Sequence, residues 1–144
     1  MLLPRRIAAF IVAALVAGCG SLGFGEGGEG LTPAGTVEGY LDASVTGDCR
    51  VASRLATPDL VRQGLWCDNP RVLSFGELEV LEGTAADLSM TYAVDAVVIG
   101  GTGLEQRGLR AGENEVIVRV VRETGGTWRV SETSARLPPL QPGP

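Results

Sequence analysis

Beyond residue 31, the apolar residues follow first a helical and then a strand period. Between Thr32 and Gly47 they recur three and four positions apart, which predicts a helix that begins at a Thr-Pro pair and ends at a glycine. Asp48 and Thr57 have side chains suited to N-caps, so two shorter helices are expected after them. From Arg71 onward the period is two, which is typical of strands that bury one face.

Four strands are expected in the second half of the chain. Their ranges are 72–82, with a kink or bulge at Gly76, and then 87–99, 114–123 and 127–136. Asp95 points outward from the second strand, whose inner face consists of Leu88, Met90, Tyr92, Val94, Ala96 and Val98. A long polar connection, residues 100–112, follows this strand. The pattern predicts an α+β fold, with N-terminal helices packed on a curved antiparallel sheet of about four strands.

The register of the last two strands depends on the length of the loop around residues 124–126. A three-residue loop pairs Val120 with Val130, which brings apolar residues together. In the same register Arg122 lies opposite Trp128. A two-residue loop would instead pair Val121 with Val130. We favour the three-residue loop.

The N-terminus has the three parts of an export signal. Arg5 and Arg6 precede an unbroken apolar run, residues 7–17, and Gly18 is a small residue before Cys19. As a helix this run is about 16 Å long. The hydrocarbon core of a bilayer is about 30 Å thick, which takes a helix of about 20 residues to span. The segment Val-Ala-Gly-Cys at 16–19 resembles the lipobox of bacterial lipoproteins. The alternative is an ordinary signal peptide with a chance cysteine.

The lipobox resemblance implies a specific organisation of the chain. Residues 1–18 would be a lipoprotein signal peptide, and Cys19 would carry diacylglyceryl and a further acyl chain such as palmitate. The protein would then be lipid-anchored at the extracytoplasmic face of the cell membrane. Residues 19–31 would be a flexible tether, because six of residues 20–30 are glycine. One α+β domain at 32–137 and a disordered proline-rich tail at 138–144 complete the chain.

The charge and the residue inventory exclude several functions. After residue 18 the chain has ten Arg against seventeen Asp and Glu, a net charge of −7, and it contains no Lys or His. We expect no nucleic-acid partner, because phosphate contacts need clustered basic residues. Histidine is the usual base of hydrolase triads and a common zinc ligand, so we expect no metal, no cofactor and no catalytic residue.

Cys49 and Cys67 are expected to form a disulfide. They remain when Cys19 is set aside, and an exported domain meets an oxidising environment. Closing a loop of this length is worth about 3 kcal/mol on the chain-entropy estimate. The alternative is a redox or metal pair, but two cysteines with seventeen residues between them and no histidine make a poor zinc site.

Two segments resemble those of a known fold family. Thr-Val-Glu-Gly-Tyr-Leu-Asp-Ala at 36–43, with Gly-Asp-Cys at 47–49, is similar to the first helix of small exported proteins with the nuclear-transport-factor-2-like (cystatin-like) fold. Val-Arg-Val-Val-Arg-Glu at 118–123 and Trp-Arg-Val-Ser at 128–131 are similar to their last hairpin. Together with the lipobox, the chain resembles a small exported lipoprotein of actinobacterial type. The resemblance implies a cone of sheet and helices around a pocket.

Aromatic side chains could line such a pocket, although residues of this kind are more often core residues. The candidates are Tyr40, Trp66, Phe75, Tyr92 and Trp128. Glu132 is predicted on the face of Trp128 and is the best inward carboxylate, although it could also lie at the rim. Isomerase-like chemistry would need this carboxylate beside a donor such as Tyr92.

Two functions remain open. In the first, the domain is a non-catalytic binding or interaction module of the cell envelope, and its partner is an envelope protein. In the second, it uses the cone pocket as a carrier of a small apolar ligand or as an isomerase-like enzyme, as in the ketosteroid isomerases that share the fold. We favour the first, because general-base catalysis would depend on a single buried carboxylate.

Overall fold

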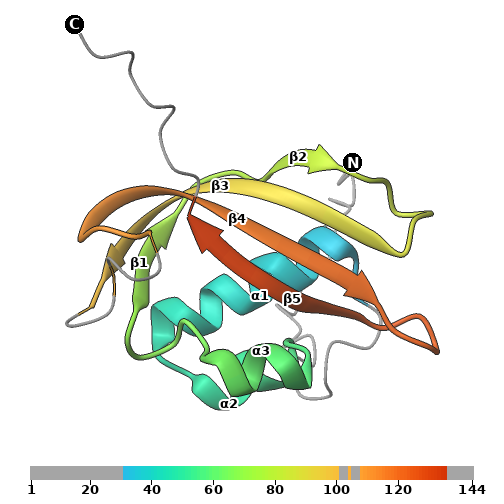
Figure 1. Cartoon of the computed structure of the whole chain (residues 1–144), viewed down its shortest axis with the longest axis horizontal. Helices are drawn as coiled ribbons and strands as arrows, with labels where there is room; N and C mark the ends of the chain where they lie inside the picture. Colours follow the sequence, from blue (N-terminus) through green and yellow to red (C-terminus); the bar gives the residue numbers. More distant parts are fainter. Residues whose placement is uncertain (1–30, 101–103, 105–107, 136–144) are drawn as a thin grey trace, which may run out of the picture.

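A computed structural model describes residues 31–100, 104 and 108–135 (Figure 1). The predicted signal peptide, the lipidation site, the tether up to residue 30 and the tail lie outside the described residues. The elements are α1 (Pro33–Thr46), α2 (Cys49–Arg54), α3 (Pro58–Gln63), β1 (Arg71–Phe75), β2 (Glu79–Glu82), β3 (Ser89–Ile99), β4 (Gly112–Arg122) and β5 (Trp128–Ala135). The α+β prediction is therefore confirmed, with an open antiparallel sheet of five strands rather than four.

The sheet has the order β1-β3-β4-β5, and β2 pairs with β3 as well. β1 and β2 follow one another along the same edge of β3. The single strand expected at 72–82 is therefore divided, close to the predicted kink at Gly76. The amide of Gly76 still donates to the carbonyl oxygen of Asp95 at 2.9 Å. In Figure 1 the helices lie together on one side of the sheet, with α1 directly beneath it; we call the opposite side the outer face.

All three helices begin at the predicted N-caps. The side-chain oxygens of these residues accept backbone N–H groups of the first turn, as the local sequence requires. The pairs are Thr32 with Gly35 at 3.0 Å, Asp48 with Val51 at 3.1 Å, and Thr57 with Leu60 at 3.3 Å. The predicted C-cap of α1 is Gly47, whose φ of +72° is left-handed and therefore favours glycine.

The core lies between α1 and the sheet. Its largest fully buried side chains come from α1, from all strands except β2, and from the segment before β1: Val37, Tyr40, Leu41, Trp66, Val72, Val94, Val98, Val116, Val118, Val120 and Val130. The predicted inner face of β3 is buried from Met90 to Val98. Leu88, which was expected to begin this face, is 76% exposed because the strand starts one residue later.

The connection between β3 and β4 also contributes to the core, which its polar composition did not predict. Leu104 and Leu109 are 7% and 3% exposed, and the amide of Leu109 donates to the carbonyl oxygen of Leu104 at 2.9 Å. At Gly100 a Cβ would lie 2.8 Å from Oδ1 of Asn69 and 3.2 Å from the side chain of Leu104. Glycine at this position therefore permits the connection to pack closely against the turn before β1.

Two hydroxyl groups on the buried side of α1 hold the segment that leads into β1. The hydroxyl oxygen of Tyr40 accepts the backbone N–H of Trp66 at 3.0 Å. The hydroxyl oxygen of Ser44 accepts the backbone N–H of Val72 at 2.9 Å. Both serine and tyrosine are buried, so these bonds satisfy amides that water cannot reach.

The predicted disulfide joins the same segment to α2. Cys49 and Cys67 are bonded, with their Cα atoms 5.2 Å apart. Nearby, a guanidinium nitrogen of Arg71 donates to the carbonyl oxygen of Val45 at 2.6 Å, near the end of α1. The segment between α3 and β1 is thus held by covalent and polar contacts together.

The favoured hairpin register is confirmed. Val120 pairs with Val130 and Arg122 with Trp128, so the three-residue loop is the correct one. The other edge of β5 is partly covered by the link between α2 and α3. The amide of Val130 donates to the carbonyl oxygen of Leu55 at 2.7 Å, and the carbonyl oxygen of Val130 accepts the amide of Thr57 at 2.8 Å.

We expect Tyr40→Phe to lower the free energy of unfolding by about 1–3 kcal/mol, because it leaves the buried N–H of Trp66 without its acceptor. Tyr92→Phe is the matched control. It removes a hydroxyl that donates to the thioether sulfur of Met90 at 3.4 Å, a weak acceptor, and should cost less than about 1 kcal/mol. Urea unfolding followed by tryptophan fluorescence measures both values. Equal decreases in the free energy of unfolding would show that the hydrogen bond from Trp66 to Tyr40 contributes no more than the weak contact of Tyr92.

Candidate functional site

The aromatic candidates for a pocket lining pack in the interior, as the core interpretation expected. Tyr40, Trp66, Tyr92 and Trp128 are buried in one hydrophobic cluster, and Phe75 packs against it while only partly buried. The structure therefore brings these residues together, under the sheet and around α1. In the part of the chain that the structure describes, they have the contacts of core side chains.

Glu132 lies on the opposite face of the sheet from the one predicted. Val130 pairs with Val120, but Glu132 pairs with Arg119, so Ser131 is an extra residue in β5. A β-bulge of this kind shifts the alternation of side chains by one position. Glu132 consequently shares the outer face with Arg119 and is exposed. The prediction that it points inward beside Trp128 is wrong, because a period of two does not reveal an inserted residue.

The environment of Tyr92 changes the proton affinity of its phenol. Burial raises the pKa of its phenol above the usual value of 10.0, and the negative charge of Glu38 on α1 raises that pKa further. An isomerase-like site would need a carboxylate inside the fold next to this phenol. Among the described residues, however, the buried polar side chains are Thr36 and Ser44, and no carboxylate is buried.

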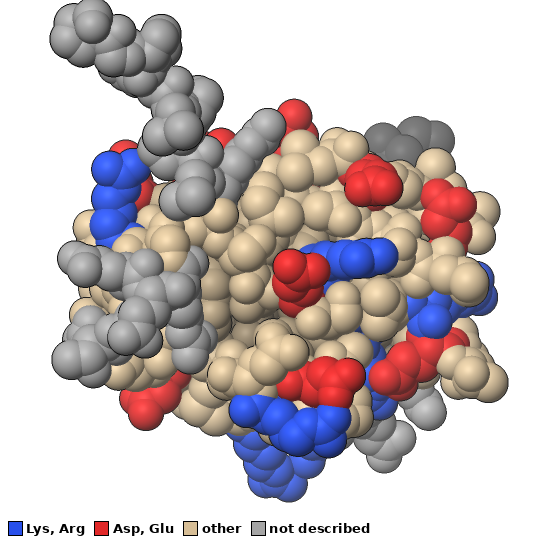
Figure 2. All heavy atoms as spheres, viewed as in Figure 1, with Lys and Arg blue, Asp and Glu red and all other residues tan. Residues whose placement is uncertain are grey.

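A more open site lies where α2 and α3 meet the turn between β4 and β5. It is a groove of about 570 Å³ lined by Ser53, Ala56, Pro58, Val61, Arg62, Glu123 and Arg129. We call it the α2–α3 groove. Its apolar part comes from the link between the helices and from Val61 on α3, which is 41% exposed. In Figure 2 a large group of basic side chains lies at the lower edge of the molecule, where Figure 1 places α2 and α3.

One wall of the α2–α3 groove is built by Arg129. Its Nε donates to a carboxylate oxygen of Glu123 at 2.7 Å, and an Nη donates to the carbonyl oxygen of Arg54 at the end of α2. This guanidinium therefore connects the β4–β5 hairpin to the helices. Because both polar contacts fix its plane, the wall is ordered before any partner arrives.

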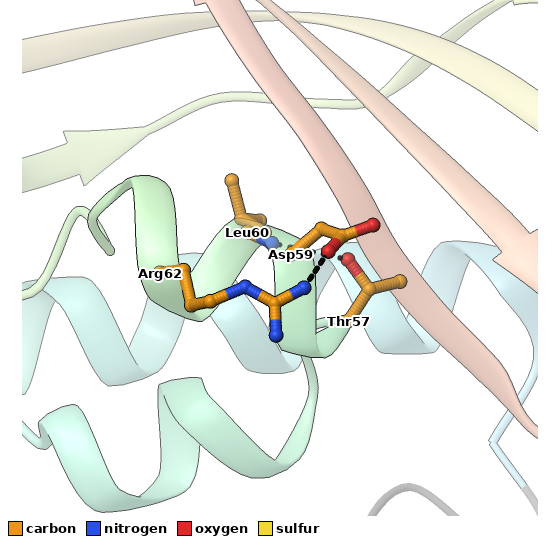
Figure 3. A network of polar contacts seen from close by, with 4 residues as sticks. All are labelled: Thr57, Asp59, Leu60 and Arg62. Atoms are coloured by element: carbon orange, nitrogen blue, oxygen red, sulfur yellow. Dashed lines mark hydrogen bonds and ion pairs between the residues drawn. The ribbon is translucent and has the colours of Figure 1, made fainter.

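The opposite wall belongs to α3. Arg62 pairs with Asp59 one turn earlier on the same helix, and both side chains are largely exposed (Figure 3). Exposed pairs of this type contribute little to stability, about 0–1 kcal/mol. Their guanidinium and carboxylate groups can therefore exchange partners at low cost. The groove combines an apolar floor with charged groups of both signs, an arrangement typical of protein-binding surfaces.

The sequence reasoning missed the α2–α3 groove for a physical reason. No local pattern shows that α3 lies next to the β4–β5 turn. The favoured hairpin register contained part of the signal, since it places Arg129 opposite Val121 and hence diagonal to Glu123. That diagonal pair predicts an ion pair but does not indicate which helix faces it.

Neither a metal centre nor a membrane span is found within the described ranges. No group of three or more His, Cys, Asp or Glu residues there could hold a metal ion. None of the helices in these ranges is long and apolar enough to cross a bilayer. No protein-family model matches the chain, and no curated protein matches it significantly.

The raised pKa of Tyr92 predicts how stability depends on alkaline pH. The phenol stays protonated to higher pH in the folded than in the unfolded chain, so its contribution is complete below pH 10.0 and is lost as the pH rises through the folded-state value. We expect the free energy of unfolding to fall above about pH 10 in the wild type, and less steeply in Tyr92→Phe. The free energy of unfolding in urea, measured at pH values about one unit apart between about 8 and 11, tests this expectation. Identical slopes in both proteins would refute it.

Proposed function

We propose that this chain is a membrane-anchored lipoprotein whose extracytoplasmic domain is a non-catalytic binding module of the cell envelope. The anchoring part of the proposal depends on the segment 5–19: two arginines, an apolar run too short to span a bilayer, and Cys19 after Val-Ala-Gly. Two or more acyl chains on Cys19 suffice for stable membrane attachment. The glycine-rich residues that follow suit a tether that leaves the domain free to reorient.

The finer description of the fold belongs to the same proposal. Three helices packed on one side of a five-stranded antiparallel sheet are compatible with the nuclear-transport-factor-2-like cone. In this proposal the domain keeps the cone but fills it. Support comes from the burial of Tyr40, Trp66 and Trp128 in one cluster under the sheet.

The α2–α3 groove is the observation that carries the proposal of binding. It is open to solvent, has a preformed wall at Arg129, and leaves the apolar side chain of Val61 accessible. An envelope protein that inserts an apolar side chain between Pro58 and Val61 would bury this floor and meet polar partners on both walls. The isomerase-like alternative has no comparable support, because Glu132 lies on the outer face.

Lipid anchoring predicts that Cys19→Ala releases the protein from the membrane fraction or leaves it as an uncleaved precursor. The acyl chains supply nearly all the membrane affinity, since the mature chain is acidic and is not attracted to anionic headgroups. Fractionation of cells and mass spectrometry of the N-terminus measure the outcome. Ser21→Ala, two residues away in the tether, should stay in the membrane fraction. Wild-type protein that is soluble, begins elsewhere and carries no lipid would refute the anchor.

Binding at the α2–α3 groove predicts position-specific crosslinking. A photo-crosslinking residue at Val61 should capture a defined envelope protein in intact cells, and the same residue at Leu73, which is similarly exposed on β1, should not. Val61→Asp should then abolish capture from a crosslinker at Pro58, because it places a charge on the apolar floor. Its far-ultraviolet circular dichroism should be unchanged. Equal capture at both positions, or no effect of Val61→Asp, would contradict the proposal.

A further inference from the structure

The outer face carries a row of four polar side chains, one from each of four neighbouring strands. Glu82, Thr91, Arg119 and Glu132 come from β2, β3, β4 and β5 in that order. Each is the register partner of the next, so the four lie in a straight line across the sheet. We call this set the cross-strand row. It is distinct from the α2–α3 groove and plays no part in the membrane anchor.

Two β-bulges create this row. In β2, Val80 pairs with Tyr92 and Glu82 with Thr91, so one extra residue, Leu81, lies between them. In β5 the extra residue is Ser131. If the same residues paired without bulges, Glu82 would lie opposite Met90 and Glu132 opposite Val118, and both carboxylates would face the helices.

The two bulges occur at the same level of the sheet, because their partners Thr91 and Arg119 are opposite each other. A bulge in an edge strand discourages that edge from pairing with another chain. This protection does not require the bulges on the two edges to be aligned with each other. Their alignment has a further effect: it directs two carboxylates to opposite ends of one row. Bulges that re-aim side chains are common next to functional sites.

The cross-strand row lines a depression, and its charged side chains are exposed and free to contact a ligand. A hollow of about 300 Å³ is lined by the four residues and by Ile117, which adds an apolar contact in the next row. Glu82, Arg119 and Glu132 are exposed, and none of them forms an ion pair within the described part of the chain. The volume is at the lower end of the range for ligand pockets, which favours a small ligand.

We propose that the cross-strand row binds a short zwitterion of dipeptide size. The ligand's carboxylate accepts from the guanidinium of Arg119, which is suited to a bidentate contact. Its ammonium group donates to Glu82, and its central amide meets the hydroxyl of Thr91. Glu132, the register partner of Arg119 on β5, lies at the other end of the row.

The spacing of the strands supports this choice. Glu82 and Arg119 belong to strands two positions apart, so their backbones are separated by about 10 Å. A dipeptide spans about 7 Å between its charged ends, and the flexible Glu and Arg side chains can close the difference. A single amino acid would require a larger movement of both side chains than a dipeptide does, and a doubly blocked dipeptide has no charge for either group.

The test uses the isotope-labelled full-length chain in detergent micelles, titrated with alanyl-alanine and followed by amide chemical shifts. We expect saturable shifts at Thr91, Arg119 and Glu132. N-acetyl-alanyl-alanine, which lacks the ammonium group, and alanyl-alanine amide, which lacks the carboxylate, should each bind about tenfold more weakly or worse. Free alanine keeps both charges but has a shorter span, and it should also bind about tenfold more weakly. This comparison also separates a free amino acid from a peptide as the source of the zwitterion.

Matched variants locate the site. Arg119→Gln and Glu82→Gln should each weaken alanyl-alanine binding about tenfold. Arg122→Gln on the same strand as Arg119, and Glu79→Gln on the same strand as Glu82, lie outside the hollow and should bind as the wild type does. All four residues are exposed, so the folded spectrum should persist. Absence of saturable shifts, shifts centred on another surface, equal affinity for the blocked dipeptides, or equal losses in the matched pairs would overturn the proposal.

Discussion

The burial of α1 beneath the sheet is the constraint on which the rest of the structure depends. A helix in that position faces a strand layer on one side and the segment leading into β1 on another, where water cannot satisfy backbone amides. Tyr40 and Ser44 provide the acceptors for two such amides. The Cys49–Cys67 bond then limits how far the segment can move when the chain opens. Apolar packing and a few buried polar contacts thus act on the same short stretch of chain.

The features that the sequence predicted are those with local causes. Thr32, Asp48 and Thr57 define helix starts because each cap acts within four residues. The hairpin register followed from loop length and from the match of Val120 with Val130. The disulfide followed from a cysteine count combined with an expected compartment. The caps and the hairpin depend on residues that are close together in the sequence. The disulfide could be predicted because only two cysteines remain besides Cys19.

The features that the sequence did not predict depend on inserted residues or on distant neighbours. One extra residue in β5 moved Glu132 to the outer face and removed the only carboxylate expected beside Tyr92. Leu104 and Leu109 stand in a glycine-rich, polar stretch, so their burial could not be separated from loop composition. The aromatic residues chosen as pocket candidates did come together, yet as core. The alternation of apolar and polar residues in a strand does not reveal where a bulge lies. The helical spacing of apolar residues does not reveal which helix packs against which turn.

The edges of the sheet have a consequence for crowding. β5 is covered at Val130 by the link between α2 and α3, and the opposite edge is broken between β1 and β2. There β2 is short and bulged, and it begins and ends with a glutamate, Glu79 and Glu82. Under the proposed lipid anchoring, the domains would be confined to two dimensions, where neighbouring copies collide far more often than in free solution. With neither edge continuous, such collisions offer no template for adding strand to strand. If the proposed anchor holds, interrupted edges of this kind would disfavour strand pairing between neighbouring domains on the membrane.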